Sequence, residues 1–169
     1  MEKQSTSFGS CFAQIAWVVP DVHASEKFFT EVFGISNFIK LENISSKENE
    51  GRYNGEPDDY VFHLYMASSG DTLIELIQPV SGDSMFQKYL DKNPEGGVQH
   101  IAYMIPASEL DQAVSELTGK GYPVIHSLRL PVANVAFFST EKEIGVATEI
   151  IGLTEAGVQL IQQMKTGAA

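Results

Sequence analysis

Apolar and polar positions alternate along the chain in an order that predicts strands and helices. An apolar, β-branched run over 11–19 stops at Pro20 and predicts the first strand. Asp21 is a typical N-cap for the helix that follows, and Gly34 is a typical residue just past its C-terminal end. Phe28 lies four residues before Val32 and predicts an apolar face on this helix. Further strands are predicted over 35–42, 60–67 and 72–78.

A similar order of elements begins again in the second half. A strand over 98–105 precedes a helix that starts like a capping box, with Asp111 three residues after Ser108. More strands are predicted over 123–130, 134–139 and 146–151. A short amphipathic helix over 84–91 connects the halves, and a last helix starts at Thr154. Its apolar stripe has 3-4 spacing and consists of Gly157, Leu160, Ile161 and Met164.

The segment 43–59 differs from its surroundings because Ser, Asn, Glu, Asp and Gly dominate it. Such a composition predicts a long solvated loop. Loops of that length are uncommon in compact domains and are often lids or mobile insertions.

The two halves are also similar in their letters. The run Gln14–Pro20 matches His100–Pro106 at Ile, Ala and Pro, with an aromatic residue at the same place in each. The run 73–77 matches 147–151 and aligns Glu75 with Glu149. The repeat therefore puts a Gln and a His at one pair of equivalent positions, and two carboxylates at another.

These four polar residues lie among apolar neighbours in predicted strands. A carboxylate is costly to bury unless it is paired or binds a metal ion, so two at equivalent places suggest one shared site. An amide oxygen, an imidazole nitrogen and two carboxylates suit Zn, Ni, Co, Mn or Fe, with positions left open for water or substrate. Open positions are typical of a catalytic metal.

The charge and the residue composition of the chain exclude several classes of binding partner. The chain has 169 residues, with 11 Lys and Arg against 22 Asp and Glu, and a net charge of −11. This charge argues against binding to nucleic acid or to an anionic membrane. A single cysteine, Cys11, excludes an internal disulfide and a cysteine zinc cluster. The apolar runs are too short for a bilayer and no signal-like start is seen, so we expect a cytoplasmic protein.

From 11 to 152 the chain resembles the vicinal oxygen chelate superfamily, which includes glyoxalase I, methylmalonyl-CoA epimerase, extradiol dioxygenases and bleomycin-resistance proteins. The runs 74–79, 96–102 and 135–138 look most like methylmalonyl-CoA epimerase. The resemblance implies an α+β fold of two paired βαβββ modules, whose curved eight-stranded sheet encloses a cavity. It divides the chain into a flexible tail (1–10), a first module (11–80), a connection (81–97), a second module (98–152) and a C-terminal helix and tail (153–169).

The resemblance also assigns roles. It gives the four metal positions to Gln14, Glu75, His100 and Glu149, although the epimerases usually have His where Gln14 stands. The family chemistry is proton abstraction beside a carbonyl, with the metal stabilising an enolate and a carboxylate moving the proton. Glu149 is one candidate base. A second base comes from just before the third strand, where Asp58 and Asp59 both remain candidates.

The expected function is that of a metal-dependent isomerase or epimerase acting on a small carbonyl acid or thioester, with Co, Ni, Zn or Mn as the metal. A glyoxalase I-type lyase is an alternative, because some of those enzymes use Gln, Glu, His and Glu. A further alternative is a non-catalytic binding protein of the bleomycin-resistance type. A ring-cleaving dioxygenase is a less favoured alternative. The expected partner is a small-molecule substrate, and dimers are common in the family. Whether the modules close the site within one chain or across two stays open.

Two further histidines, His63 and His126, lie on predicted strands. Each is a candidate for the cavity wall, although a structural histidine is the more common case. Arg129 is a candidate for holding an anionic substrate, against the more common role of a surface ion pair.

Overall fold

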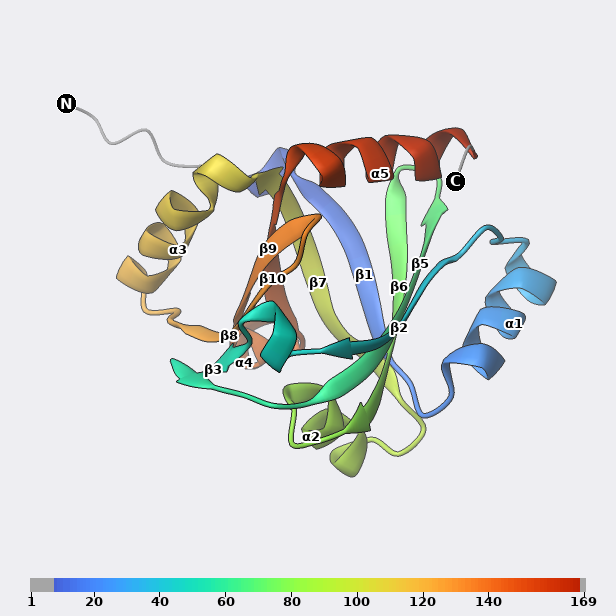
Figure 1. Ribbon diagram of the computed structural model, residues 1–169, viewed down its shortest axis with the longest axis horizontal. Helices are drawn as coiled ribbons and strands as arrows, with labels where there is room; N and C mark the ends of the chain where they lie inside the picture. Colours follow the sequence, from blue (N-terminus) through green and yellow to red (C-terminus); the bar gives the residue numbers. More distant parts are fainter. Residues whose placement is uncertain (1–7, 168–169) are drawn as a thin grey trace.

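A computed structural model describes residues 8–167 and shows one strongly curved sheet with helices on its outside and across its ends (Figure 1). The first half runs β1 (Phe12–Val18), α1 (Val22–Phe33), β2 (Ile39–Ser45), β3 (Arg52–Tyr53), β4 (Glu56–Pro57), β5 (Val61–Ser69) and β6 (Thr72–Ser81). Then come α2 (Met85–Lys92), β7 (Gly97–Pro106), α3 (Leu110–Gly119), β8 (Val124–Arg129), β9 (Ala133–Phe138), α4 (Glu141–Ile144), β10 (Ala147–Leu153) and α5 (Glu155–Thr166).

The sheet has ten strands in the order β2-β5-β6-β1-β7-β10-β9-β8-β3-β4. The expected α+β fold with a curved sheet is confirmed, and the predicted repeat is visible in it. In each half the first strand pairs in parallel with the last, β1 with β6 and β7 with β10. The two halves join where β1 pairs antiparallel with β7. A single chain thus builds the whole curved sheet. The expected count of eight strands is wrong, because β3 and β4 add to the edge beyond β8.

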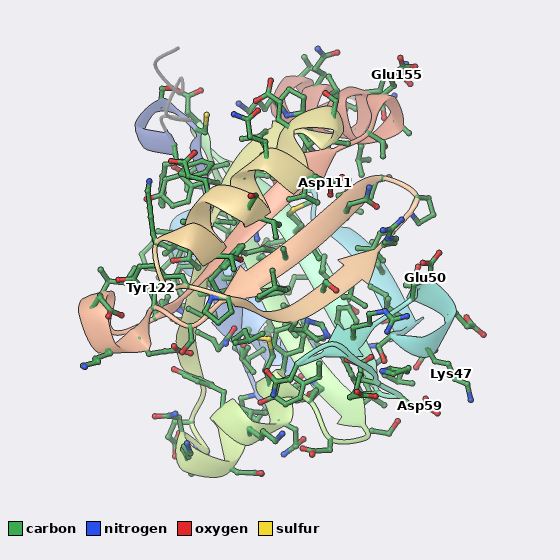
Figure 2. All side chains as sticks on the ribbon, turned by 90° about the vertical axis from the view of Figure 1, so that its left-hand side faces the viewer. Lys47, Glu50, Asp59, Asp111, Tyr122 and Glu155 are labelled. Atoms are coloured by element: carbon green, nitrogen blue, oxygen red, sulfur yellow. The ribbon has the colours of Figure 1, made fainter. Side chains whose placement is uncertain are left out.

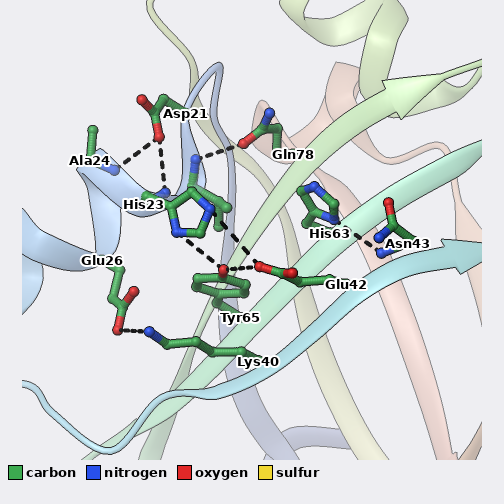
Figure 3. A network of polar contacts seen from close by, with 11 residues as sticks. Asp21, His23, Ala24, Glu26, Lys40, Glu42, Asn43, His63, Tyr65 and Gln78 are labelled. Atoms are coloured by element: carbon green, nitrogen blue, oxygen red, sulfur yellow. Dashed lines mark hydrogen bonds and ion pairs between the residues drawn. The ribbon is translucent and has the colours of Figure 1, made fainter.

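Helix α1 begins and ends where the sequence predicts. The Asp21 carboxylate accepts hydrogen bonds from the backbone N–H groups of His23 and Ala24 at 3.0 Å (Figure 3). Gly34 takes the left-handed conformation, with a φ of 69°, that ends the helix. The apolar face of the helix is less buried than its pattern suggests, since Phe28 and Val32 are 52% and 59% exposed.

The start of α3 corrects the sequence prediction. A 3₁₀ turn over Ala107–Glu109 leads into the helix, and the structure shows no side-chain cap bond at its first residues. The capping box expected from Ser108 and Asp111 is therefore wrong. The turn supplies local backbone hydrogen bonds in place of a side-chain cap.

Residues 46–60, which we call the strap, are mostly exposed, as the composition of 43–59 predicts, but they are folded and do not form an irregular loop. The strap folds on itself, with the N–H of Ser46 donating to the carbonyl of Tyr60 at 2.9 Å and the N–H of Asp58 donating to that of Gly51 at 3.1 Å. Strand β3 inside it pairs with β8, opposite His126. Because the strap starts at β2 and ends at β5, it connects the two edges of the curved sheet (Figure 1). Short polar side chains suit this role because they satisfy nearby backbone groups.

Helix α5 lies across one end of the curved sheet, where it contacts both β10 and β5 (Figure 1). The predicted apolar stripe faces the body of the protein, with Gly157 and Met164 buried. Within residues 8–167, none of the helices has the length and apolar content needed to cross a membrane. The division into domains predicted above stays a prediction, and residues 1–7 of the predicted tail lie outside the described part.

Helix α5 packs closely against the backbone at Gly157. A methyl group added at Gly157 would lie 2.0 Å from the backbone carbonyl oxygen of Val132. Gly157→Ala should therefore lower the free energy of unfolding by about 1–3 kcal/mol, measured by urea denaturation. Gly119→Ala, at the end of α3 with open space around it, is the matched control and should leave stability unchanged or slightly raised. Equal effects of the two changes would show that α5 does not pack as described.

Candidate metal centre

The four predicted metal-site residues come from four neighbouring strands and lie together. Gln14 on β1 and Glu149 on β10 both pair with Ala102 of β7. His100 on β7 and Glu75 on β6 both pair with Ala16 of β1. The two polar pairs thus occupy successive levels of the same face, separated by alanines that add little bulk. Side chains on alternate positions of adjacent strands share one face, which here is the concave one.

Distances within the group are short. The Nε2 atom of His100 lies 3.2 Å from Oε2 of Glu75 and 3.3 Å from Oε2 of Glu149. The amide nitrogen of Gln14 donates to the same Glu149 oxygen at 3.3 Å. One ligand atom from each of Glu75, His100 and Glu149 lies within 4.8 Å of the others. Gln14 and His100 are fully buried, and the two glutamates are 6% and 5% exposed.

Two buried atoms in the group have no hydrogen-bond partner among the described residues: Oε1 of Gln14 and Nε2 of His100. The imidazole nitrogen faces both carboxylates but completes no hydrogen bond with either, which is costly for a buried polar atom. The other ring nitrogen, Nδ1, is held by the side chain of Gln99 at 2.7 Å, an arrangement that orients metal-binding histidines. The donor set and its free lone pairs therefore fit a divalent cation.

Burial and charge shift the proton affinities in this group. Burial disfavours a charged His100, but the facing carboxylates of Glu149 and Glu75 outweigh it and raise its pKa to about 9. Burial also raises the pKa of Glu149, and the nearby Glu75 adds to the effect while His100 opposes it. Without a cation, a proton on His100 balances part of the two negative charges.

A second buried polar group lies beside the first. Nε2 of His126 is 2.9 Å from Oδ2 of Asp58 and 3.0 Å from the hydroxyl of Tyr60. Burial lowers the pKa of His126 against the pull of Asp58. Burial, then Asp58 and Glu149, hold the pKa of Tyr60 well above its usual value. Both histidine rings pack on Phe137, with centroid distances of 5.1 Å for His100 and 5.5 Å for His126.

The two candidates for a second base differ in their surroundings. Asp58 is buried against His126, and its other oxygen, Oδ1, has no partner among residues 8–167. Asp59 points outward and lies 3.5 Å from the ammonium of Lys47, with both side chains largely exposed (Figure 2). This difference cannot be read from the sequence, because the fold of the strap decides which carboxylate turns inward.

Other residues considered from the sequence lie away from the centre. His63 accepts a hydrogen bond from the backbone of Asn43 at 3.0 Å, beside the partly buried network in which Tyr65 donates to Glu42 (Figure 3). Arg129 is exposed and lies 3.8 Å from Glu50. His126, in contrast, lies in the polar group beside the centre. The sequence pattern did not indicate this position, because the partners of His126, Asp58 and Tyr60, belong to the strap, which is distant in the chain.

A pocket on the concave face is bordered by Gln14, Glu75 and Glu149. Its remaining walls are apolar and come from both halves of the sheet, the strand β2 and helix α5. The candidate metal ligands Gln14, Glu75 and Glu149 therefore border a pocket whose other lining residues are apolar or glycine.

Comparison with known proteins places this geometry in a family. A model of the Glyoxalase/Bleomycin resistance protein/Dioxygenase superfamily matches residues 13–137. The chain belongs to this superfamily. The resemblance drawn from the sequence is confirmed, and so is the similarity to methylmalonyl-CoA epimerases.

Among curated relatives, the chain is 28% identical over 123 residues to an ethylmalonyl-CoA/methylmalonyl-CoA epimerase of Cereibacter sphaeroides, covering 70% of this chain and 81% of that protein. It is 27% identical over 108 residues to mitochondrial methylmalonyl-CoA epimerase of Mus musculus, covering 63% of this chain and 51% of that protein. The chain thus spans about half the length of the mouse relative.

Solved structures agree in fold. Methylmalonyl-CoA epimerase from Mycobacterium tuberculosis superposes with a TM-score of 0.64 at 18% identity, covering 99% of this chain and 98% of that one. A variant of Streptomyces coelicolor methylmalonyl-CoA epimerase, in complex with 2-nitronate-propionyl-CoA, superposes with a TM-score of 0.61 at 23% identity. The match covers 85% of this chain and 94% of that one. At this identity the likeness shows a shared fold.

The raised pKa of His100 predicts proton release on metal binding. In the metal-free protein the imidazole keeps its proton up to a pH of about 9, whereas a metal ligand must be neutral. At pH 7 about one proton per ion should therefore be released from this residue, and apparent affinity should rise with pH until about 9. Calorimetry in buffers of different ionisation enthalpy measures the release.

The control for this prediction is His100→Asn, which removes the titrating ring and should abolish that release. Binding of Co, Ni, Zn or Mn with no proton release in the unaltered protein would contradict the protonation state derived from the two carboxylates.

Proposed function

We propose that the protein is a divalent-metal-dependent isomerase or epimerase that removes a proton beside the carbonyl of a small acid or thioester, through an enolate. One observation carries the proposal. Glu149 belongs to the buried donor set and also borders the pocket, so a single carboxylate is near both a cation and a substrate. A purely structural cluster would not need to open into a pocket.

The residues of the candidate metal centre and of the pocket walls have different roles in this reaction. Gln14, Glu75, His100 and Glu149 would hold a divalent cation, which when bound supplies Lewis-acid stabilisation of negative charge on a carbonyl oxygen. Glu149 is also the candidate base, because its carboxylate belongs to the donor set and borders the pocket where a substrate would lie. The apolar walls exclude water, which strengthens electrostatic interactions at the reacting carbon.

Inversion at a carbon atom requires a second proton carrier. We assign this role to Asp58, since it is buried in a group with His126 and Tyr60 beside the metal centre, whereas Asp59 is at the surface. The charges of Asp58 and Glu149 both act on Tyr60. Nε2 of His126 lies 3.0 Å from the Tyr60 hydroxyl and 2.9 Å from Oδ2 of Asp58, so the three residues form one buried polar cluster.

The relatives support this class of reaction. Both curated relatives carry the name of a CoA-thioester epimerase, and one solved relative was crystallised with methylmalonyl-CoA and NH4+. A non-catalytic binding protein is the second candidate, because apolar walls dominate the pocket. Such a protein would bind ligands but would not exchange their protons.

The deciding experiment is proton exchange in deuterated water. Metal-loaded protein is incubated with methylmalonyl-CoA, propionyl-CoA and simple 2-methyl ketoacids, and loss of the α-proton signal is followed by NMR. Glu149→Gln should slow exchange by about 10²–10⁴-fold while the variant still binds metal through its amide oxygen. Glu143→Gln, an exposed change on α4, is the control and should have no effect. Unchanged exchange in Glu149→Gln would exclude this residue as the base.

The adjacent aspartates provide a matched pair for the second carrier. Asp58→Asn should slow inversion of configuration by about 10²-fold or more, while exchange with retention through Glu149 continues. Asp59→Asn changes the neighbouring but exposed residue. It should leave the rates of inversion and of exchange with retention unchanged. Chiral separation of the product, combined with deuterium content, measures the two processes separately. Equal behaviour of the two variants would remove Asp58 from the mechanism.

A further inference from the structure

The pocket beside the metal centre has an unusual distribution of polar groups. In the described part of the chain, the polar residues among its lining are Gln14, Glu75 and Glu149, which belong to the metal centre. All others are apolar or glycine, and none is Lys or Arg. A charged group on a ligand that entered beyond the metal centre would find no cation to pair with, which is costly in a buried place.

The apolar wall continues from the metal centre to α5. Glu149, Ile151 and Leu153 are alternate residues of β10 and all border the pocket, so they face the same side of the strand. The rise of a strand puts about 13 Å between Glu149 and Leu153. Met104 of β7, the neighbour of β10, and Met66 of β5, in the other half of the sheet, line the same space.

Helix α5 closes this apolar end. It contacts β10 and β5, on opposite sides of the centre of the sheet, and turns Gly157, Leu160 and Ile161 toward the pocket. Thr154 fixes its start by accepting a hydrogen bond from the N–H of Gly157 at 3.2 Å and donating one to the carbonyl of Pro131 at 3.0 Å. Val158, which does not line the pocket, is 42% exposed on the same helix.

We infer that the substrate carries an uncharged apolar body, a branched or extended carbon chain or a ring, beside its enolisable carbonyl. Leu160 and Ile161 of α5 recognise this body and determine specificity. The inference rests on the proposed function for the reacting end of the substrate and adds the chemistry of its other end. A carboxylate, phosphate or amide-rich arm must remain outside the apolar part of the pocket.

A series of alkyl hydroxamates tests the inference by binding alone. Each member presents the same two vicinal oxygens to a divalent metal, while the chain grows from acetohydroxamate to octanohydroxamate. The full-length protein is loaded with Co²⁺, or with Ni²⁺, Zn²⁺ or Mn²⁺ if Co²⁺ does not bind, and Kd is measured by calorimetry. Each added methylene should lower Kd by up to about fourfold, the equivalent of about 0.8 kcal/mol, until the chain reaches α5. Octanohydroxamate should bind at least about 100-fold more tightly than acetohydroxamate.

Variants of α5 locate the effect. Leu160→Phe fills the end of the pocket. It should therefore raise the Kd of octanohydroxamate by about tenfold or more and leave the Kd of acetohydroxamate unchanged. Leu160→Ala should also reduce the advantage of the long chain. Val158→Ala, on the exposed face of the same helix, is the control and should change neither Kd. Circular dichroism and urea unfolding verify that each variant is folded.

Two outcomes overturn the inference while the proposed function stands. One is a Kd that does not depend on chain length. The other is tighter binding of a succinic acid monohydroxamate, whose chain ends in a carboxylate, than of octanohydroxamate. Failure of acetohydroxamate to bind any metal-loaded form would instead count against the metal centre.

An independent probe keeps the inference testable in that case. The neutral fluorophore N-phenyl-1-naphthylamine should bind the metal-free protein, with at least about tenfold weaker binding to Leu160→Phe. No binding to the unaltered protein, or equal binding to both, would overturn the inference.

Discussion

The antiparallel pairing of β1 with β7 is the contact on which the site depends. It joins two halves with the same strand order and puts β6, β1, β7 and β10 side by side. Each of these four strands supplies one polar residue to the concave face. A shift of the β1–β7 register by one residue would turn Gln14 away from that face and destroy the group. The same pairing makes the sheet continuous within one chain, so the centre is formed without a second copy.

Charge explains why the centre and the pocket differ in character. Two carboxylates and one imidazole are buried together, and their mutual contacts leave Nε2 of His100 facing negative charge on two sides. A divalent cation would balance both carboxylates at once. Beyond this point the walls become apolar, so the protein concentrates its buried charge at one place. That separation allows one end of a ligand to react while the other is held by packing.

Two segments outside the repeated strand order complete the enclosure. The strap connects the edges of the curved sheet and carries Asp58 to His126, while α5 crosses one end and contacts both halves. Among the described residues, the second half has no segment like the strap between its middle strands, β8 and β9. Helix α5 follows β10 as α2 follows β6, but α2 contacts β6 and β1 instead of crossing to the other half. The repeated strands thus provide the candidate metal centre, and the strap and α5 shape what can approach it.

The sequence by itself determined most strands and helices, because apolar periodicity and the capping residues Asp21 and Gly34 act over short distances. The internal repeat also aligned the four residues of the candidate metal centre. Only the tertiary structure decided the rest: the strap crosses to β8, Asp58 turns inward while Asp59 does not, and α5 closes the pocket. The physical reason is that these features depend on contacts between residues far apart in the chain. Local composition records that a segment is polar or amphipathic, but it does not record which distant surface completes its hydrogen bonds or covers its apolar face.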